Sequence, residues 1–314
     1  MKSMLDPALL NENVELLAAN FKPDEINHLG KLLFKEYDSH KLSGTDNHIT
    51  LSSRRCADVL VNQCGAANKT LNLIKLIADL EESSIFGREV RIEGLEIFLN
   101  NLARAGLVYD PDSRRFVKND VDKFELVNWG SLRSGRSYEF TVMSLDIVGN
   151  SKLVKKYGSR AMEKLYYQFR MFLVRKVSQY DGRFWGYAGD GCLIAFTFKH
   201  HADRAVKCAV DIQLTMPLFN IDSVIPIEDH LTLRMAMDTG RIRFMAKTGT
   251  IVSEVINYAA HLEKSGTEPG GVSISDKTAQ SLNSRVLTMF EEKHPFEGRV
   301  YYATSGKIEH SLNG

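Results

Sequence analysis

Hydrophobic residues recur every three to four positions through the first third of the chain, which is the spacing of one face of an α-helix. Polar or glycine-containing turns separate the segments that show this spacing. Five helices are therefore predicted, over residues 11–20, 23–36, 51–63, 72–80 and 93–105. Together they predict a small all-α N-terminal domain over residues 1–117, and no motif for chemistry appears in it.

The last helix of this region has a second interpretation. A helix over Glu93–Ala105, followed by the apolar runs Gly106-Leu-Val-Tyr-Asp and Arg115-Phe-Val, is also the pattern of a winged-helix-like module. The acidic run Asp79-Leu-Glu-Glu disfavours DNA as its partner.

Periodicity is lost over residues 118–137, where we predict a linker. Short apolar runs then alternate with helical patterns. Strands are predicted over 140–148, 184–187, 192–198, 231–238, 241–245, 272–275, 285–290 and 299–304, with a turn at Thr239-Gly240. Helices are predicted over 159–180, 202–216 and 253–264, with a short one from Asp276. This order is typical of the α+β class, as a ferredoxin-like or palm-like domain over residues 138–314 with a mostly antiparallel sheet and helices on one side.

The composition is that of an ordinary globular protein, with 314 residues, 44% hydrophobic and 25% charged. A net charge of +1 gives no electrostatic case for nucleic acid or an acidic membrane as a partner. No apolar run reaches the roughly 18 residues that cross a bilayer, and the N-terminus lacks a signal-like apolar core. The four cysteines show no CxxC spacing, so we expect reduced thiols in a cytoplasmic protein.

Two carboxylates stand out within the second region. Asp146 lies near the end of a buried strand that Gly149 interrupts, and Asp190 lies in the turn Gly189-Asp190-Gly191 between two apolar runs. A strand-end carboxylate and one at a hairpin tip can meet on adjacent strands, where they would call for divalent cations with hard oxygen ligands. Taken singly, each aspartate also fits an ordinary solvated position.

Four segments around these residues resemble, in the same order, the motifs of class III nucleotidyl cyclases, the adenylyl and guanylyl cyclase family. They are LDIVGNSKL, WGYAGDGCLIAF, LRMAMDTGR and VINYAAHLE, and the resemblance runs from Tyr138 to Ala303. It implies attack of a ribose 3′ hydroxyl on the α-phosphate of the same nucleoside triphosphate, which releases pyrophosphate. It also implies two divalent cations, Mn²⁺ or Mg²⁺, bridged by Asp146 and Asp190, with the backbone carbonyl of Ile147 as a further ligand.

The resemblance assigns the triphosphate to the turn after the first strand. Gly149 permits a tight turn, so the amides of Val148–Ser151 can face phosphate oxygens, and Asn150 and Ser151 are candidate substrate-binding residues. Asn150 departs from the family, which usually has Phe there. Arg234, within an otherwise apolar strand, needs an anionic partner. That partner is either Asp238 or Glu228 in an ion pair, or a β- or γ-phosphate of the substrate, as in the family.

Two residues on the last motif complete the implied catalytic set. Asn257 matches the family's asparagine, which orients the ribose, and His261 stands four residues later on the same helical face. His261 replaces an arginine that stabilises charge on the phosphate. Histidine carries that charge only when it is protonated. Lys264 or Arg299 are alternative sources of the charge.

The base-reading positions differ most from the family. Gly186 stands where adenylyl cyclases have Lys and guanylyl cyclases have Glu, and the second such position falls near Thr250. Alternation places Trp185 on the strand face opposite Gly186. GRFWGYAGDG resembles a bacterial subgroup that makes cyclic pyrimidine nucleotides, cUMP or cCMP, as antiphage alarm signals. In that setting Tyr187 is a candidate to bind a pyrimidine edge, or else it packs as an ordinary strand residue.

The family resemblance also implies a homodimer, in which each composite active site takes residues from both protomers. Three alternatives stay open. One is an adenylate cyclase of ordinary bacterial signalling. Another is a catalytically weak cyclase-like module that binds nucleotide and regulates. The last is a diguanylate-cyclase or polymerase-palm relative, which the absence of a GG[DE]EF run disfavours.

Overall fold

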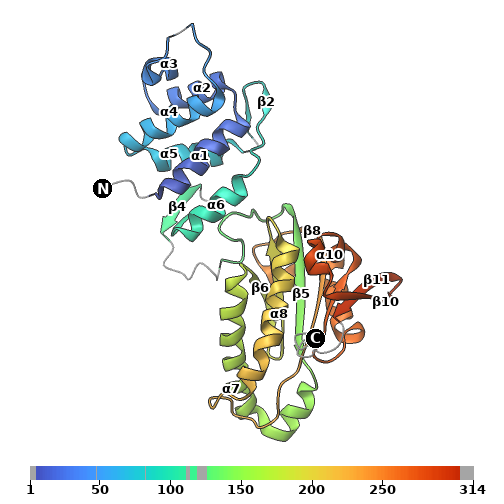
Figure 1. The fold of residues 1–314 in the computed structure, drawn as a ribbon. Helices are drawn as coiled ribbons and strands as arrows, with labels where there is room; N and C mark the ends of the chain where they lie inside the picture. Colours follow the sequence, from blue (N-terminus) through green and yellow to red (C-terminus); the bar gives the residue numbers. More distant parts are fainter. Residues whose placement is uncertain (1–4, 47, 82, 111–113, 119–125, 305–314) are drawn as a thin grey trace. The chain divides into compact units, whose positions relative to one another are not determined.

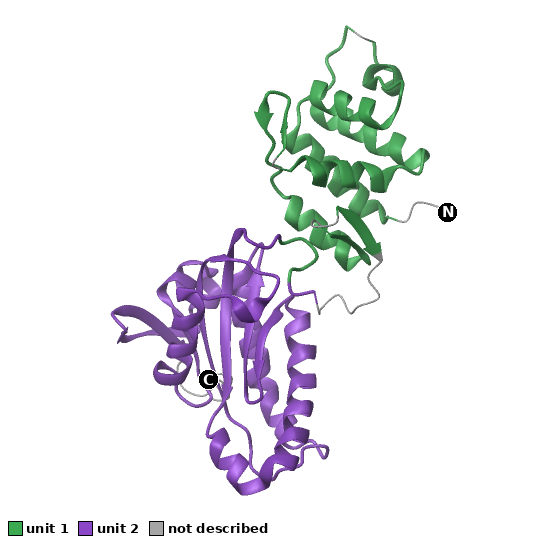
Figure 2. Cartoon of the chain, turned by 180° about the vertical axis from the view of Figure 1, so that it is seen from behind, with its two compact units in different colours: residues 1–123, 128–132 green, residues 124–127, 133–314 purple. Residues whose placement is uncertain are grey.

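The computed structural model describes residues 5–46, 48–81, 83–110, 114–118 and 126–304. Part of the predicted linker and the last ten residues of the predicted second domain lie outside these ranges. The chain divides into two compact units (Figure 2): unit 1 comprises residues 1–123 and 128–132, and unit 2 comprises residues 124–127 and 133–314. None of the described helices is long and apolar enough to cross a membrane.

Unit 1 is mainly helical and encloses its own apolar core, with Leu17, Ile26, Leu60 and Ile74 fully buried. Its helices are α1 (Pro7–Asn20), α2 (Pro23–Leu33), α3 (Ser39–Ser43), α4 (Ser53–Ala66), α5 (Thr70–Leu80) and α6 (Leu95–Arg104). It also contains two short antiparallel hairpins, β1 (Ser84–Ile85) with β2 (Arg88–Glu89) and β3 (Leu107–Asp110) with β4 (Arg115–Lys118). The second hairpin follows α6 as the winged-helix-like alternative expected, so the unit is not purely helical.

Unit 2 is built on one seven-stranded sheet. The strands are β5 (Ser137–Ile147), β6 (Arg183–Ala188), β7 (Gly191–Thr197), β8 (Leu233–Arg243), β9 (Val272–Ser275), β10 (Phe290–Phe296) and β11 (Arg299–Thr304). Their order is β10-β11-β9-β8-β5-β7-β6, and every described pair is antiparallel except β8 with β9. The predicted α+β class with a mostly antiparallel sheet is confirmed.

Helices cover both faces of this sheet, and not one face as expected (Figure 1). The long helices α7 (Asn150–Gln179) and α8 (His201–Asn220) pack on the face that Met235 and Met237 present. Ala236 points to the other face by strand alternation, where it packs against Tyr258 and Leu262. Those two residues belong to α9 (Glu254–His261) and to the π-helical turn Leu262–Gly266 that follows it.

The predicted turn at Thr239-Gly240 is wrong, because β8 continues through both residues. Thr239 pairs with Thr141 and Gly240 with Phe140 on β5. A Cβ atom on Gly240 would lie 2.9 Å from Cγ2 of Val255, so this glycine allows α9 to approach the strand closely. Glycine inside a strand can mark such an approach as well as a turn, and the sequence alone does not separate the two.

The predicted strand over 285–290 is also wrong. The short helix α11 (Ser284–Leu287) occupies it, and β10 begins at Phe290. Asn283 caps α11 by accepting a hydrogen bond from the backbone N–H of Arg285. A shorter helix, α10 (Asp276–Gln280), precedes it, as predicted from Asp276. The predicted helix over 159–180 begins earlier, at Asn150, with a non-helical break at Gly158.

Candidate active site

Asp146 and Asp190 lie side by side at one end of the central strands. Asp146 pairs across the ladder with Gly191, the residue after Asp190, and the backbone N–H of Ile147 donates to the carbonyl of Asp190 at 3.2 Å. A Cβ atom on Gly191 would lie 3.0 Å from the carbonyl oxygen of Leu145 and 3.5 Å from Oδ1 of Asp146. Glycine at this position therefore lets the β6–β7 turn close against the end of β5.

The charges of the two aspartates are coupled. Burial raises the pKa of Asp146, a hydrogen bond from Arg234 opposes that effect, and the negative charge of Asp190 raises the pKa further. The described residues include no group of three or more His, Cys, Asp or Glu side chains that would cage a metal. Mg²⁺ is usually held by one or two carboxylates together with substrate phosphates, so this pair fits a cation that binds with a triphosphate.

Arg234 lies across the ladder from Asp146 and is surrounded by acceptors. One Nη donates to Oδ2 of Asp146 at 3.2 Å, Nε lies 3.2 Å from Oε1 of Glu263, and the other Nη donates to the carbonyl of Lys264 at 3.1 Å. The alternative in which Arg234 forms an ion pair with Asp238 or Glu228 is therefore wrong. An arginine in this strand did need an anionic partner, but the partners are Asp146 and Glu263.

Glu263, a partner of Arg234, was not predicted from the sequence. Its side chain is only 8% exposed, and its pKa is raised to about 7 by burial and by the charge of Asp146, against the opposing effect of Arg234. The chain passes from α-helical to π-helical geometry at Leu262, so face assignments at α-helical spacing fail from this point on. In the sequence, the signal for such a residue was Arg234 itself, an arginine in an otherwise apolar strand that needs an anionic partner.

Glu263→Gln should change how stability depends on pH. Because the pKa of Glu263 rises from 4.5 to about 7 on folding, the folded chain holds a proton that the unfolded chain releases. Its contribution to stability is therefore full below the unfolded pKa and is lost as the pH rises towards 7, by at most about 3 kcal/mol. We expect the melting temperature of the natural chain to fall relative to that of Glu263→Gln between pH 5 and pH 8. A constant difference would contradict the burial of an acid here.

The helix that follows β5 begins at the expected glycine. Gly149 has the left-handed backbone (φ 71°) and caps α7, so Asn150 and Ser151 stand in its first turn. The N–H of Val148 already donates to the carbonyl of Thr232 at 2.9 Å, and it is not available to a phosphate in this structure. The predicted set of amides is therefore reduced to those that follow Val148.

Asn150 contacts the carboxylate of Asp190 directly. Its Nδ2 donates to Oδ2 of Asp190 at 2.8 Å, and its Oδ1 accepts from the hydroxyl of Tyr166 at 2.8 Å. Tyr166 lies on α7 and was not singled out from sequence. Burial raises the pKa of its hydroxyl, and the charges of Asp190 and Asp146 add to that effect.

Gly186 and its neighbours Trp185 and Tyr187 are divided between the two faces of the sheet. A bulge between Phe184 and Gly186 shifts the register of β6, and the ring of Trp185 packs 4.6 Å from that of Phe140. Phe140 and Asp146 share a strand face, and so does Gly186 through its pairing with Leu193. The expectation that Trp185 and Gly186 face opposite sides is wrong because the bulge adds a residue.

Tyr187 lies on the other face, against the core beneath α7. Its ring lies 5.4 Å from the guanidinium of Arg170, and its buried hydroxyl has no hydrogen-bond partner among the described residues. The structure therefore does not bring Tyr187 together with Gly186 and Asp146.

Asn257 and His261 are both exposed on α9. Nδ1 of His261 lies 3.0 Å from Oε1 of Glu297. Thr250 belongs to the 3₁₀ turn Thr248–Thr250, and its hydroxyl donates to the carbonyl of Lys247. In the described part of the chain, no hydrogen bond or ion pair joins these three residues to Asp146 or Asp190.

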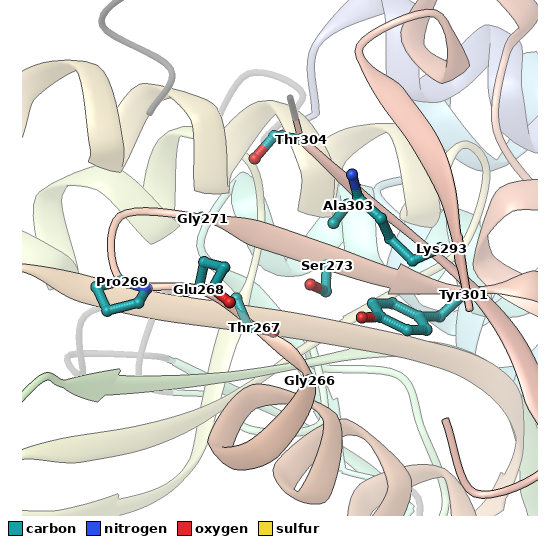
Figure 3. Close-up of a pocket in the computed structure, with 10 residues that line it drawn as sticks. All are labelled: Gly266, Thr267, Glu268, Pro269, Gly271, Ser273, Lys293, Tyr301, Ala303 and Thr304. Atoms are coloured by element: carbon teal, nitrogen blue, oxygen red, sulfur yellow. The ribbon is translucent and has the colours of Figure 1, made fainter. Parts of the chain in front are cut away.

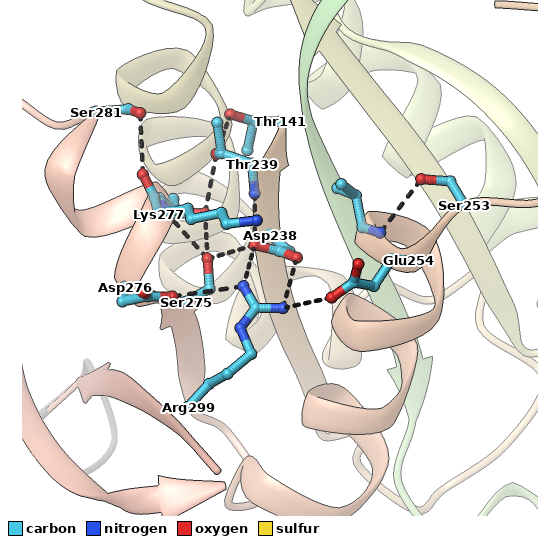
Figure 4. A network of polar contacts seen from close by, with 12 residues as sticks. Thr141, Asp238, Thr239, Ser253, Glu254, Ser275, Asp276, Lys277, Ser281 and Arg299 are labelled. Carbon is cyan, nitrogen blue, oxygen red and sulfur yellow. Dashed lines mark hydrogen bonds and ion pairs between the residues drawn. The ribbon is translucent and has the colours of Figure 1, made fainter. Parts of the chain in front are cut away.

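Arg299 already has acidic partners within its own chain, as Figure 4 shows. Its two Nη atoms lie 3.3 and 3.1 Å from the carboxylate of Asp238, which is 1% exposed, and its guanidinium stacks 3.7 Å from the ring of Tyr258. Arg299 and Lys264 were the two alternatives to His261 as a source of positive charge at the phosphate. Arg299 is held by Asp238 and Tyr258, whereas the side chain of Lys264 is exposed.

Unit 2 also contains a cavity of about 480 Å³ (Figure 3). It is lined by Gly266, Thr267, Glu268, Pro269, Gly271, Ser273, Lys293, Tyr301, Ala303 and Thr304. None of the site residues expected from sequence belongs to this lining, so the cavity is not the candidate site.

Comparison with known proteins gives a partial match. No protein-family model matches the chain. The chain is similar to a putative adenylate cyclase. That protein, putative adenylate cyclase 3 of Rhizobium meliloti (strain 1021), is 29% identical over 144 residues. The match covers 46% of this chain and 23% of the relative, so the chain spans about a quarter of the length of the curated relative it matches.

Solved structures give weaker likenesses. The guanylate cyclase domain of RhGC from Catenaria anguillulae, in complex with GTP, is 18% identical with a TM-score of 0.47, covering 55% of this chain and 99% of that one. The adenylyl cyclase CyaB from P. aeruginosa is 22% identical with a TM-score of 0.46, and the match covers 54% of this chain and 95% of that one. At these scores the likenesses do not establish a function for this chain.

Proposed function

We propose that this chain is a nucleotidyl cyclase that converts a nucleoside triphosphate to its 3′,5′-cyclic monophosphate and pyrophosphate. The observation that carries the proposal is the juxtaposition of Asp146 and Asp190 at the ends of hydrogen-bonded strands. The sequence similarity to a putative adenylate cyclase supports the same reaction class. Two neighbouring carboxylates with an arginine beside them are suited to phosphoryl chemistry that cations assist.

Asp146, Asp190 and the carbonyl of Ile147 would hold two divalent cations, Mn²⁺ or Mg²⁺. When bound, such cations make an attacking hydroxyl more acidic and stabilise the charge on a leaving phosphate oxygen. The N–H groups of Asn150 and Ser151, in the first turn of α7, would donate to phosphate oxygens, as helix N-termini commonly do. Arg234 already contacts Asp146 and Glu263, so a role at the β- or γ-phosphate would require it to exchange the Asp146 contact for phosphate.

We further propose a homodimer with composite active sites. Asn257 and His261 are exposed and have no contact with the aspartates of their own chain in the described residues. A partner subunit that presented this face of α9 would supply the asparagine for the ribose and the histidine for the phosphate, with Thr250 near the base.

A pyrimidine nucleotide is the proposed substrate, with cUMP or cCMP serving as an antiphage signal. The support is the absence of a long polar side chain at Gly186, which shares a sheet face with Asp146. Tyr187 contributes to base binding only if it leaves its packing beneath α7. The similarity to a putative adenylate cyclase favours ATP as the alternative substrate.

Incubation of the purified chain with Mn²⁺ and each of UTP, CTP, ATP and GTP tests this function. We expect a cyclic product and pyrophosphate in equal amounts, with a pyrimidine nucleotide preferred. Nucleotide binding by calorimetry with no product from any substrate would instead indicate a regulatory nucleotide-binding module.

Gly186→Lys is expected to raise the preference for ATP over UTP and CTP by about tenfold, since one well-placed polar contact to a base contributes about 1–3 kcal/mol. A side chain fits there, because a Cβ atom on Gly186 would meet only Cβ of Leu193, at 3.7 Å. The kcat/KM ratio for ATP against each pyrimidine nucleotide measures the shift. An unchanged ratio in a folded variant would remove Gly186 from the base site.

A further inference from the structure

The hydrogen bonds around Asn150 allow only one arrangement of donors and acceptors. An ionised carboxylate accepts hydrogen bonds and donates none, so the amide NH₂ of Asn150 must face Asp190. The amide oxygen then points the other way and must accept from the hydroxyl of Tyr166. Tyr166 therefore fixes which way the amide of Asn150 is turned.

The two aspartates are thus oriented by different partners. Arg234 holds one oxygen of Asp146, and Asn150 holds one oxygen of Asp190, each through Oδ2. The second arrangement carries no added charge, since both Asn150 and Tyr166 are neutral. It fixes the direction of the Asp190 carboxylate through a hydrogen bond and places no charged group against it.

We propose that Tyr166 is a positioning residue of the cation site and acts on Asp190 through Asn150. The inference rests on the proposed function, and it gives Asn150 a role in orienting a metal-binding carboxylate in addition to its place near the phosphates. Replacing a residue that hydrogen-bonds to a metal ligand typically lowers metal affinity by about 10–100-fold. Tyr166 and Asn150 lie 16 positions apart, at opposite sides of the helix break at Gly158.

Tyr166→Phe is the sharpest test, because it removes one oxygen and keeps the ring that packs against the core. Mn²⁺ binding is measured by electron paramagnetic resonance of the free ion, with a 3′-deoxynucleoside triphosphate that cannot cyclise. We expect the Mn²⁺ dissociation constant to rise about tenfold in Tyr166→Phe and at least as much in Asn150→Leu. The KM for the nucleotide should change less than the Mn²⁺ requirement.

Tyr167→Phe is the matched control. Tyr167 is the next residue on the same helix, and its side chain is exposed. We expect the Tyr167→Phe variant to bind Mn²⁺ as the natural chain does. Asp146→Asn serves as the reference for the site itself. If Asp146→Asn loses Mn²⁺ binding while Tyr166→Phe and Asn150→Leu keep it, the positioning role is refuted and the proposed function stands. If Asp146→Asn binds Mn²⁺ normally, the proposed cation site fails, and the positioning role fails with it.

Discussion

Asp146→Asn is expected to reduce cyclic nucleotide formation by about a thousandfold or more. The substitution keeps the shape of the side chain but removes the negative charge that would hold a cation beside Asp190. Electrostatic contributions of several kcal/mol to a transition state are usual for such cations, and each 1.4 kcal/mol corresponds to about tenfold in rate. The measurement is kcat for the preferred nucleotide at saturating Mn²⁺.

The loss should come from chemistry and not from unfolding. Burial raises the pKa of Asp146, so its ionised form is disfavoured in the folded chain. Asparagine can still accept the hydrogen bond from Arg234, and we expect Asp146→Asn to melt no lower than the natural chain. If the sites are composite, mixing Asp146→Asn with Asn257→Ala should restore part of the activity. Turnover within tenfold of the natural chain would contradict a cation role for Asp146.

Arg299→Leu is expected to destabilise unit 2 by about 3–5 kcal/mol, because it leaves the buried carboxylate of Asp238 without its cation. Asp238 would keep the hydrogen bonds from the hydroxyl of Ser275 at 2.6 Å and from the N–H of Thr239 at 2.8 Å, and these do not neutralise its charge. Chemical denaturation followed through unit 2 measures the loss.

Two variants separate a buried ion pair from a simple loss of packing. Adding Asp238→Asn to Arg299→Leu removes the orphaned charge and should recover much of the lost stability. Arg241→Leu, an exposed arginine on β8, should change stability by less than about 0.5 kcal/mol. If Arg299→Leu were as stable as Arg241→Leu, Arg299 would be free to act elsewhere, including at the phosphate in place of the family's arginine.

The sequence predicted best those features that depend on local pattern. The Asp-Gly turn at Asp190 and the strand that ends near Asp146 follow from alternation and turn chemistry, and the bounds of β9 were predicted to the residue. Features that depend on packing between distant segments were missed. Gly240 has the appearance of a turn residue, and only the closeness of Val255 explains why the strand continues through it.

The site residues that were not predicted from the sequence also depend on geometry that local pattern does not reveal. Glu263 turns inward because the helix changes to π geometry just before it, and no spacing rule for an α-helix anticipates that. The bulge at Trp185 moves one aromatic residue to the face of Gly186, so strict alternation gave the wrong side. Tyr166 reaches the site through Asn150, across a break in α7 at Gly158, and a periodicity argument treats it only as a core residue.

Counting bound cations tests the central claim most directly. The natural chain and the double variant Asp146→Asn/Asp190→Asn would each be titrated with Mn²⁺ in the presence of a 3′-deoxynucleoside triphosphate, with free Mn²⁺ followed by electron paramagnetic resonance. We predict two Mn²⁺ ions per nucleotide-bound protomer in the natural chain, with spin coupling between them, and none held by protein carboxylates in the double variant. Equal Mn²⁺ binding by the two proteins would contradict the assignment of Asp146 and Asp190 as the cation site.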